Sequence, residues 1–278
     1  TSGGRRPRAI GVQLSSGEVI HATHVVSAVG YLNTAGKLLD QTDAKKAGLP
    51  QTLPGISSSS GFVMANIGIR GSANELKLDN INVWYHPTGG KKDIMPALQK
   101  YYQNPLESDA PAMITFPSIK AGNRNDPKTS CQMLFMAEWS WFEKFSSLSE
   151  KERETNMEYQ ALKRRWLDKA LEILFRFYPQ IRGKVEFADL STPLSINHYI
   201  EAPHGGAVGL DHTPPRYCDW EVQKHLDVST PIPNLYMTGQ DQIICGVVLA
   251  QLCGVITAFR MSGFMPSLRI VLQSIFLI

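Results

Sequence analysis

The feature that most constrains this chain is a short apolar strand pattern that runs directly into a long apolar segment. Asn234 to Met237 reads as a buried strand, and residues 238–241 place Thr, Gly, Gln and Asp at its end. An almost uninterrupted apolar stretch follows from Ile243 to Phe259. A strand that ends in a loop and continues as a helix predicts a ligand site at the junction.

Three residues at this junction have chemistry that suits such a site. Gly239 lets the backbone approach a ligand closely, and Asp241 offers a carboxylate acceptor. Gly246 opens the apolar helix, whose first amides have no partner within the helix and therefore favour anionic or electron-rich groups. These are the parts of a nucleotide or flavin site. The alternative is that Asp241 only caps the helix.

The apolar stretch itself allows two interpretations. Its 17 residues reach the lower limit of the roughly 17–25 residues that a membrane span needs. Gln251 and Thr257 interrupt it, and a strand and turn come immediately before it. We therefore favour a buried helix, with a transmembrane span as the alternative.

The rest of the chain predicts a mixed α/β protein. Ser149 and Glu152 form a capping-box pattern at the start of a long amphipathic helix that Pro179 ends. Residues 191–203 read as extended and residues 204–215 as a loop rich in glycine and proline. Period-two or continuous apolar patterns predict strands at residues 9–14, 18–21, 24–29, 62–70, 81–85, 112–116 and 132–138.

Composition narrows the function classes. With 43% hydrophobic residues and a net charge of +3, the chain is globular. Its basic cluster at Arg5, Arg6 and Arg8 is local and indicates a solvated loop, so nucleic-acid binding is not predicted. The four cysteines form no CxxC pair, so we expect reduced thiols and no structural zinc. His204, Asp211 and His212 match no zinc spacing, and no metal is expected. No GxGxxG follows a strand, and the chain starts at Thr1, so we read it as a fragment.

Three segments carry a resemblance to a known family. They are PIPNLYMTGQDQIICGVVLAQLCG at 231–254, GKVEFADLSTPLSINHYIEAPHGGAVGLDH at 183–212, and VVSAVGYLNT at 25–34. The first resembles the C-terminal flavin-binding segment of the retinol saturases, a family grouped with the carotenoid desaturases and isomerases. The other two are similar to stretches of the same family.

The resemblance implies a two-domain FAD-dependent oxidoreductase of the amine-oxidase and phytoene-desaturase type. Its N-terminal dinucleotide-binding βαβ unit would be missing, so this chain would be a C-terminal fragment. The flavin-binding domain would comprise residues 1–35 and 185–278, with the apolar tail at its end. The substrate-binding domain would comprise residues 36–184.

The implied activity is saturation of the 13,14 double bond of all-trans-retinol to give all-trans-13,14-dihydroretinol. FAD would bind at Gly239, Asp241, Gly246 and Val247, with NAD or NADP as candidate electron sources. The general acid is unassigned, and its candidates are His198, Tyr199 and His204. A carotenoid desaturase or isomerase is the alternative within the same superfamily. A membrane-anchored interaction module is the alternative from another class.

A membrane surface is a further expected partner, beside an apolar retinoid or carotenoid-like substrate. The tail after Pro266 is mostly apolar, and the eleven residues from Leu268 to Ile278 would rise about 16 Å as a helix. That length cannot cross a bilayer but can lie in its interface, with Arg269 near the headgroups. The alternative is that the tail packs as core. The resemblance favours the interface and implies the endoplasmic reticulum membrane.

Overall fold

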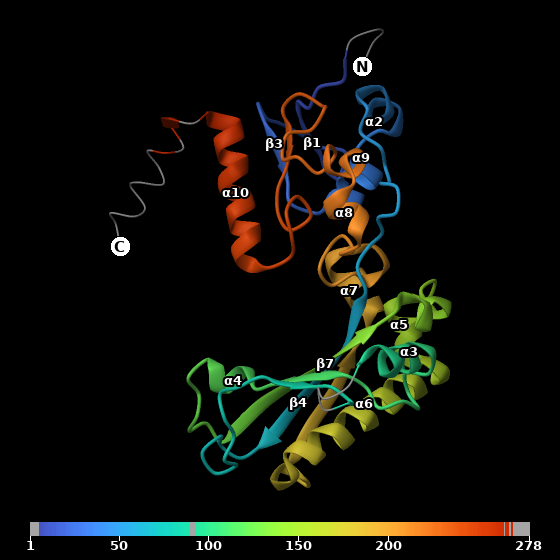
Figure 1. The fold of residues 1–278 in the computed structure, drawn as a ribbon, viewed down its shortest axis with the longest axis vertical. Helices are drawn as coiled ribbons and strands as arrows, with labels where there is room; N and C mark the ends of the chain where they lie inside the picture. Colours follow the sequence, from blue (N-terminus) through green and yellow to red (C-terminus); the bar gives the residue numbers. More distant parts are fainter. Residues whose placement is uncertain (1–5, 89–92, 264, 267, 269–278) are drawn as a thin grey trace. The chain divides into compact units, whose positions relative to one another are not determined.

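The computed structural model describes residues 6–88, 93–263, 265, 266 and 268 (Figure 1). The chain forms two compact units. The first unit comprises Thr1–Ser59 and Glu201–Ile278, and the second comprises Ser60–Ile200. The mixed α/β class that the sequence predicts is confirmed.

These boundaries differ from the sequence-based ones at 35/36 and 184/185. Residues 36–59 stay with the first unit because Leu49, Leu53 and Ile56 are buried in its core. Residues 185–200 stay with the second unit because Val185–Ser191 forms an edge strand of its sheet.

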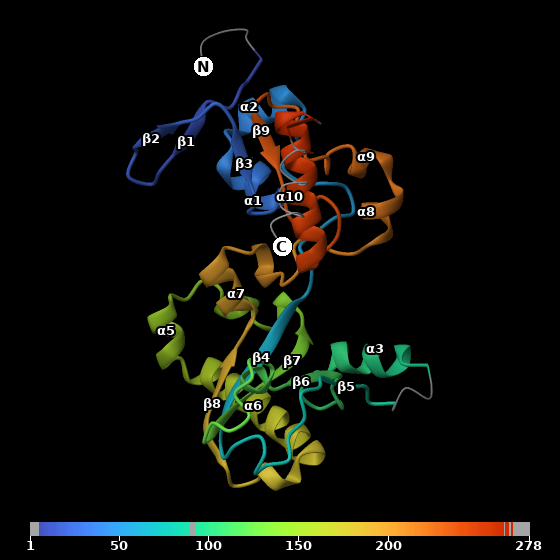
Figure 2. The ribbon, with the colours of Figure 1, turned by 90° about the vertical axis from the view of Figure 1, so that its left-hand side faces the viewer.

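The first unit is built around a parallel pair of strands, β3 (Val25–Ser27) and β9 (Leu235–Met237). Both were predicted from sequence, and both are confirmed. Because the pair is parallel, both strands end at the same edge, where the Thr238 amide donates to the Ser27 carbonyl over 2.9 Å. An antiparallel hairpin, β1 (Gly11–Gln13) and β2 (Val19–His21), projects beside them (Figure 2).

Short helices surround this pair. They are α1 (Tyr31–Asn33), the π-helical turn η1 (Thr34–Leu38), α2 (Gln41–Ala47), η5 (Pro203–Gly205), α8 (Pro214–Cys218) and α9 (Trp220–Gln223). One long helix, α10 (Val247–Ser262), lies beside β3 and β9 (Figures 1 and 2). Cys253 anchors it, because its buried thiol meets the Thr238 hydroxyl at the end of β9.

The expectation that α10 is a buried helix is wrong for most of its surface. Of its residues, Cys253 and Thr257 are buried, whereas Val247 and Val248 are 75% and 74% exposed. The helix packs along one face only, so its other apolar side chains face outward. Within the described part of the chain, no helix combines the length and hydropathy that crossing a bilayer requires. The predicted interfacial tail, residues 267–278, lies outside the described residues except for Leu268.

The second unit is a five-stranded antiparallel sheet, in the order β5-β6-β7-β4-β8. The strands predicted at 62–70, 81–85, 112–116 and 132–138 are confirmed, although the last of them begins four residues earlier than expected. The strands are β4 (Gly61–Arg70), β5 (Val83–Tyr85), β6 (Ala112–Thr115), β7 (Lys128–Ala137) and β8 (Val185–Ser191).

Helix α6 (Met157–Phe177) covers one face of this sheet (Figure 1). Its buried Trp166, Ala170 and Ile173 pack against alternate residues of β4 and β7 to form the larger core of the protein. Shorter helices surround this core. They are α3 (Met95–Gln103), α4 (Pro117–Lys120), η2 (Trp139–Trp141), η3 (Glu143–Phe145), α5 (Glu150–Thr155), η4 (Pro179–Ile181) and α7 (Pro193–Ile200).

Two sequence expectations for this unit need correction. The capping box of Ser149 and Glu152 is present, but it starts the short helix α5. Asn156 breaks the pattern there, and its side chain caps α6 by accepting from the Tyr159 amide. The expected extended stretch at 191–203 is wrong for most of its length, because Ser191 ends β8 and Pro193–Ile200 forms α7.

Candidate functional site

The predicted ligand site lies where β3 and β9 end. Asp241 follows β9 and is 3% exposed. One carboxylate oxygen accepts from the Tyr31 amide over 2.8 Å, and the other accepts from the Leu210 amide over 2.9 Å. Asp241 therefore joins three loops at the carboxyl edge of the parallel pair, the edge at which α/β proteins bind ligands.

Two glycines make room for this carboxylate. Gly30 and Gly209 both have positive φ, +85° and +76°. A Cβ at Gly30 would lie 2.8 Å from one Asp241 oxygen, and a Cβ at Gly209 would lie 2.1 Å from the other. Both positions thus require glycine for conformation and for space.

Arg216 completes the junction, and the sequence analysis missed it. Its guanidinium is 2% exposed and donates to four backbone carbonyls. On one side these belong to Leu210 and Asp211, at 2.5 and 3.3 Å, and on the other to Gln240 and Asp241, at 2.8 and 3.3 Å. An arginine after two prolines in a loop gives no sequence signal of burial, so only the fold identifies it.

The other predicted cofactor residues lie in the same segment. Gly246 stands at the N-terminus of α10 with φ +123°, and no side chain of the described residues caps the helix there. Gly239 has φ +106°, and a Cβ at either glycine would meet no described atom within 4 Å. Val247 follows Gly246 and is exposed.

This segment fits a flavin nucleotide. Among the described residues no side chain caps the first amides of α10, and the helix dipole favours an anionic or electron-rich group there. The Gln242 side chain adds a second observation, because its amide nitrogen and oxygen are both buried without a hydrogen-bond partner among the described residues. A buried orphan amide in the loop that leads into α10 is expected where a bound group completes the loop.

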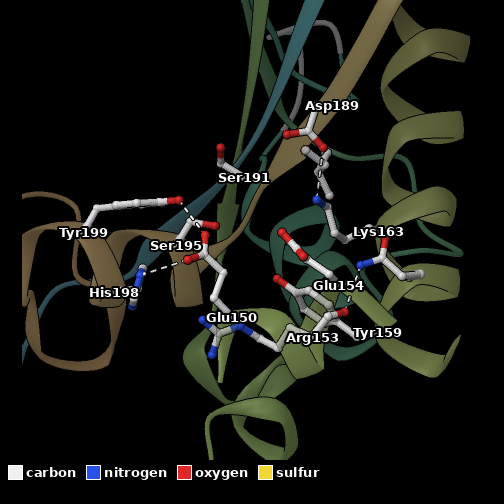
Figure 3. Close-up of a pocket in the computed structure, with 12 residues that line it drawn as sticks. Glu150, Arg153, Glu154, Tyr159, Lys163, Asp189, Ser191, Ser195, His198 and Tyr199 are labelled. Atoms are coloured by element: carbon white, nitrogen blue, oxygen red, sulfur yellow. Dashed lines mark hydrogen bonds and ion pairs between the residues drawn. The ribbon is translucent and has the colours of Figure 1, made fainter. Parts of the chain in front are cut away.

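The three candidate proton donors are divided between the units. His204 lies in the first unit, exposed, in the turn η5, where its φ is 51°. His198 and Tyr199 lie on α7 of the second unit, and both contact Glu150 of α5 (Figure 3). The Tyr199 hydroxyl donates to one Glu150 oxygen over 2.7 Å, and His198 Nε2 lies 3.4 Å from the other.

His198 and Tyr199 line a pocket of about 460 Å³ with mainly charged and hydroxyl-bearing walls. Lys163 and Asp189 form a further ion pair across it, at 3.0 Å (Figure 3). Its lining suits a polar molecule better than a polyene. The lining residues are Glu150, Arg153, Glu154, Tyr159, Gln160, Lys163, Asp189, Leu190, Ser191, Ser195, His198 and Tyr199.

Removing the Tyr199 hydroxyl should raise the pKa of Glu150. The hydrogen bond from Tyr199, helped by nearby His198, holds the pKa of that carboxyl below its ordinary value. A carboxyl group whose pKa is lowered by folding stabilises the fold at pH values above the ordinary carboxyl pKa. That stability is lost as the pH falls through the lowered pKa. In Tyr199→Phe, NMR titration of the side-chain carboxyls should show Glu150 titrating at higher pH.

Glu152 is the internal control for that titration. Hydrogen bonds from Ser149 lower its pKa, and Tyr199 does not contact it. An unchanged Glu150 midpoint in Tyr199→Phe would show that the hydroxyl does not hold the carboxylate.

No metal centre is indicated by the part of the chain that the structure describes. No group of three or more histidine, cysteine, aspartate and glutamate side chains is arranged there to hold an ion. His212 instead stacks on Tyr217, with Nδ1 2.5 Å from the phenol oxygen. Burial and the neighbouring Arg216 guanidinium lower the pKa of His212. All four cysteines are free.

Comparison with known proteins identifies relatives of one kind. No family model matches the chain. The all-trans-retinol 13,14-reductase of Danio rerio is 31% identical over 248 residues, which is 86% of this chain and 40% of the relative. The Homo sapiens protein of that name is 30% identical over 252 residues, 87% of this chain and 40% of the relative.

A second Danio rerio protein, named an inactive all-trans-retinol 13,14-reductase, is 24% identical over 245 residues. It too is matched over 86% of this chain and 40% of its own length. The chain therefore spans about 40% of the length of the curated relatives it matches.

Proposed function

We propose that this chain, which is similar to the all-trans-retinol 13,14-reductases over most of its length, forms part of an FAD-dependent oxidoreductase acting on all-trans-retinol. The reaction is saturation of the 13,14 double bond to give all-trans-13,14-dihydroretinol. The observation that carries the proposal is the 31% identity with the Danio rerio reductase over 86% of the chain. The carotenoid desaturase and the interaction module are not favoured by these relatives.

The first unit is the proposed flavin-binding part. FAD, when bound, supplies the hydride for the double bond. The N-terminus of α10 at Gly246 and Val247 stabilises negative charge on the cofactor, and Gly239 allows close approach of the backbone. The Asp241 carboxylate has lone pairs beyond its two amide bonds, and we assign these to a hydroxyl of the ribityl part of FAD, which can donate to them.

Chain outside this sequence would complete the flavin-binding part. Parallel strands normally occur in larger sheets covered on both faces, whereas β3 and β9 form a sheet of two. The exposed aliphatic side of α10 offers a further surface for packing, including Val247 and Val248. We assign the completing role to a dinucleotide-binding βαβ unit, so that the first unit alone retains FAD poorly.

The second unit is the proposed substrate-binding part. Water and the three candidate side chains, His198, Tyr199 and His204, are the proposed sources of the proton. NAD or NADP remains the proposed electron source. A membrane surface, at the endoplasmic reticulum, is the proposed location from which an apolar substrate would enter.

The test uses the full-length protein, with the human relative assayed in parallel as a positive control. Purified protein should be yellow and contain one FAD per chain. With a reductant and all-trans-retinol, chromatography and mass spectrometry should detect a product two mass units heavier and identical to authentic 13,14-dihydroretinol. Bound FAD without that product would contradict the activity, and would match the name of the inactive relative instead.

A further inference from the structure

The sheet of the second unit has a second face, turned away from α6, with its own pattern of side chains. In β4, the residues at 61, 63, 65, 67 and 69 are buried, whereas Phe62, Met64 and Asn66 between them are half-buried. In β7 the alternation is the same, and Gln132, Leu134 and Met136 point to this face. We call the six residues named here from β4 and β7 the amphipathic strip.

The strip consists of three successive cross-strand pairs. Phe62 lies opposite Met136, Met64 opposite Leu134, and Asn66 opposite Gln132. Residues directly opposite in an antiparallel sheet share a face and have Cβ atoms about 5 Å apart. The strip thus presents two apolar pairs followed by one amide pair, over about 14 Å of strand.

The neighbouring strand β6 extends both parts of the strip, whereas β8 places Ser191 opposite Met64 and Asp189 opposite Asn66. On β6, Met113 lies opposite Leu134 and continues the apolar part. Thr115 lies opposite Gln132 and continues the polar part. On β4, β7 and β6 alike, the side chains of this face therefore change from apolar to polar at the same position along the strands.

The amide pair keeps a whole NH₂ group and a whole carbonyl oxygen without a partner among the described residues. Gln132 Nε2 donates to Asn66 Oδ1 over 2.9 Å. Asn66 Nδ2 and Gln132 Oε1 have no partner among the described residues. Turning both amides around would leave the same two kinds of group free, since each amide has one oxygen and one nitrogen.

We propose that the amphipathic strip binds the substrate, with the hydroxyl on Asn66 and Gln132 and the hydrocarbon chain on the two apolar pairs. A hydroxyl donates one hydrogen bond and accepts others, so it matches a free amide nitrogen beside a free amide oxygen. The inference rests on the proposed function, and it adds the residues that select an alcohol.

The strip also distinguishes the two substrate classes that the sequence left open. A pure hydrocarbon laid on it would remove water from the amide pair without replacing the hydrogen bonds. The alcohol makes both bonds. We therefore expect the intact strip to prefer retinol over the same polyene without its hydroxyl by about 10-fold to 100-fold in affinity.

The experiment measures affinity for both ligands by retinoid fluorescence in full-length, FAD-loaded protein. The variants are Gln132→Met, which keeps the length of the side chain without its amide, and Asn66→Leu. Each should reduce the preference for the alcohol at least several-fold and bind the hydrocarbon as tightly as wild type or more tightly. Gln103→Leu, the same kind of change on α3 of the same unit, should leave the preference unchanged.

The outcomes separate this inference from the proposed function. If wild type forms dihydroretinol but both variants keep its preference for the alcohol, the strip is not the binding surface and the activity stands. If wild type binds retinol no better than the hydrocarbon, the inference also fails. Circular dichroism checks folding, and the two variants act on different strands, so a folding defect in one leaves the other to decide.

Discussion

Replacing Asp241 with alanine is expected to destabilise the first unit by about 2–6 kcal/mol. The substitution leaves the amides of Tyr31 and Leu210 without acceptors, and each unpaired buried donor costs about 1–3 kcal/mol. Chemical denaturation followed by circular dichroism measures the change. Asp227→Ala is the matched control, because Asp227 is half-exposed and should cost far less.

The same substitution should lower FAD affinity in the full-length protein by about one to two orders of magnitude, as loss of a charged acceptor predicts. Flavin occupancy is measured at limiting FAD, at a temperature where the variant remains folded. Asp241→Asn keeps one acceptor oxygen but turns an NH₂ group toward a backbone donor, so it should fall between alanine and wild type. Wild-type occupancy in the alanine variant would exclude Asp241 from the cofactor site.

In the second unit, Trp166→Ala should cost about 3–5 kcal/mol of stability. Trp166 is 1% exposed at the centre of α6, where its ring stacks on Trp141 with centroids 5.9 Å apart and lies 5.7 Å from Phe135. No smaller side chain fills that space, so a cavity remains. Denaturation is followed by far-ultraviolet circular dichroism, which does not depend on the deleted indole.

Trp84→Ala provides the comparison for that measurement. Trp84 lies on the edge strand β5 and is 67% exposed, so its removal should change stability by a small fraction of the Trp166 effect. Equal costs for the two substitutions would contradict the assignment of Trp166 to the core. Trp166→Phe, which keeps an aromatic ring in the space, should recover part of the loss.

Local patterns in the sequence were sufficient for most of the strands and for the position of Asp241. Alternation in β4 and the apolar run of β9 are properties of neighbouring residues, and the structure confirms both. The helix α7 was mistaken for extended chain because its eight residues mix polar and apolar positions without a long period. Asn156 was likewise overlooked as the cap that divides α5 from α6.

The parts that the sequence could not predict depend on contacts between distant segments. The bonds from Arg216 to the carbonyls of Gln240 and Asp241 span more than twenty residues, and no local pattern encodes them. The open side of α10 is another example. Apolar composition predicted burial there, yet burial depends on what packs against the helix, and only Cys253 and Thr257 are buried.

The contacts of Asp241 and Arg216 determine which neighbouring positions tolerate substitution. Asp241 and Arg216 bind their neighbours through backbone amides and carbonyls, so the side chains of those neighbours take no part in the bonds. Substitutions at positions 211 and 240 should therefore leave the loops in place, whereas Leu210 is buried in the core of the first unit. Gly30 and Gly209 allow no such freedom, because any side chain there would displace the carboxylate. A mutational scan of these positions should find 30, 209, 210, 216 and 241 intolerant and 211 and 240 permissive.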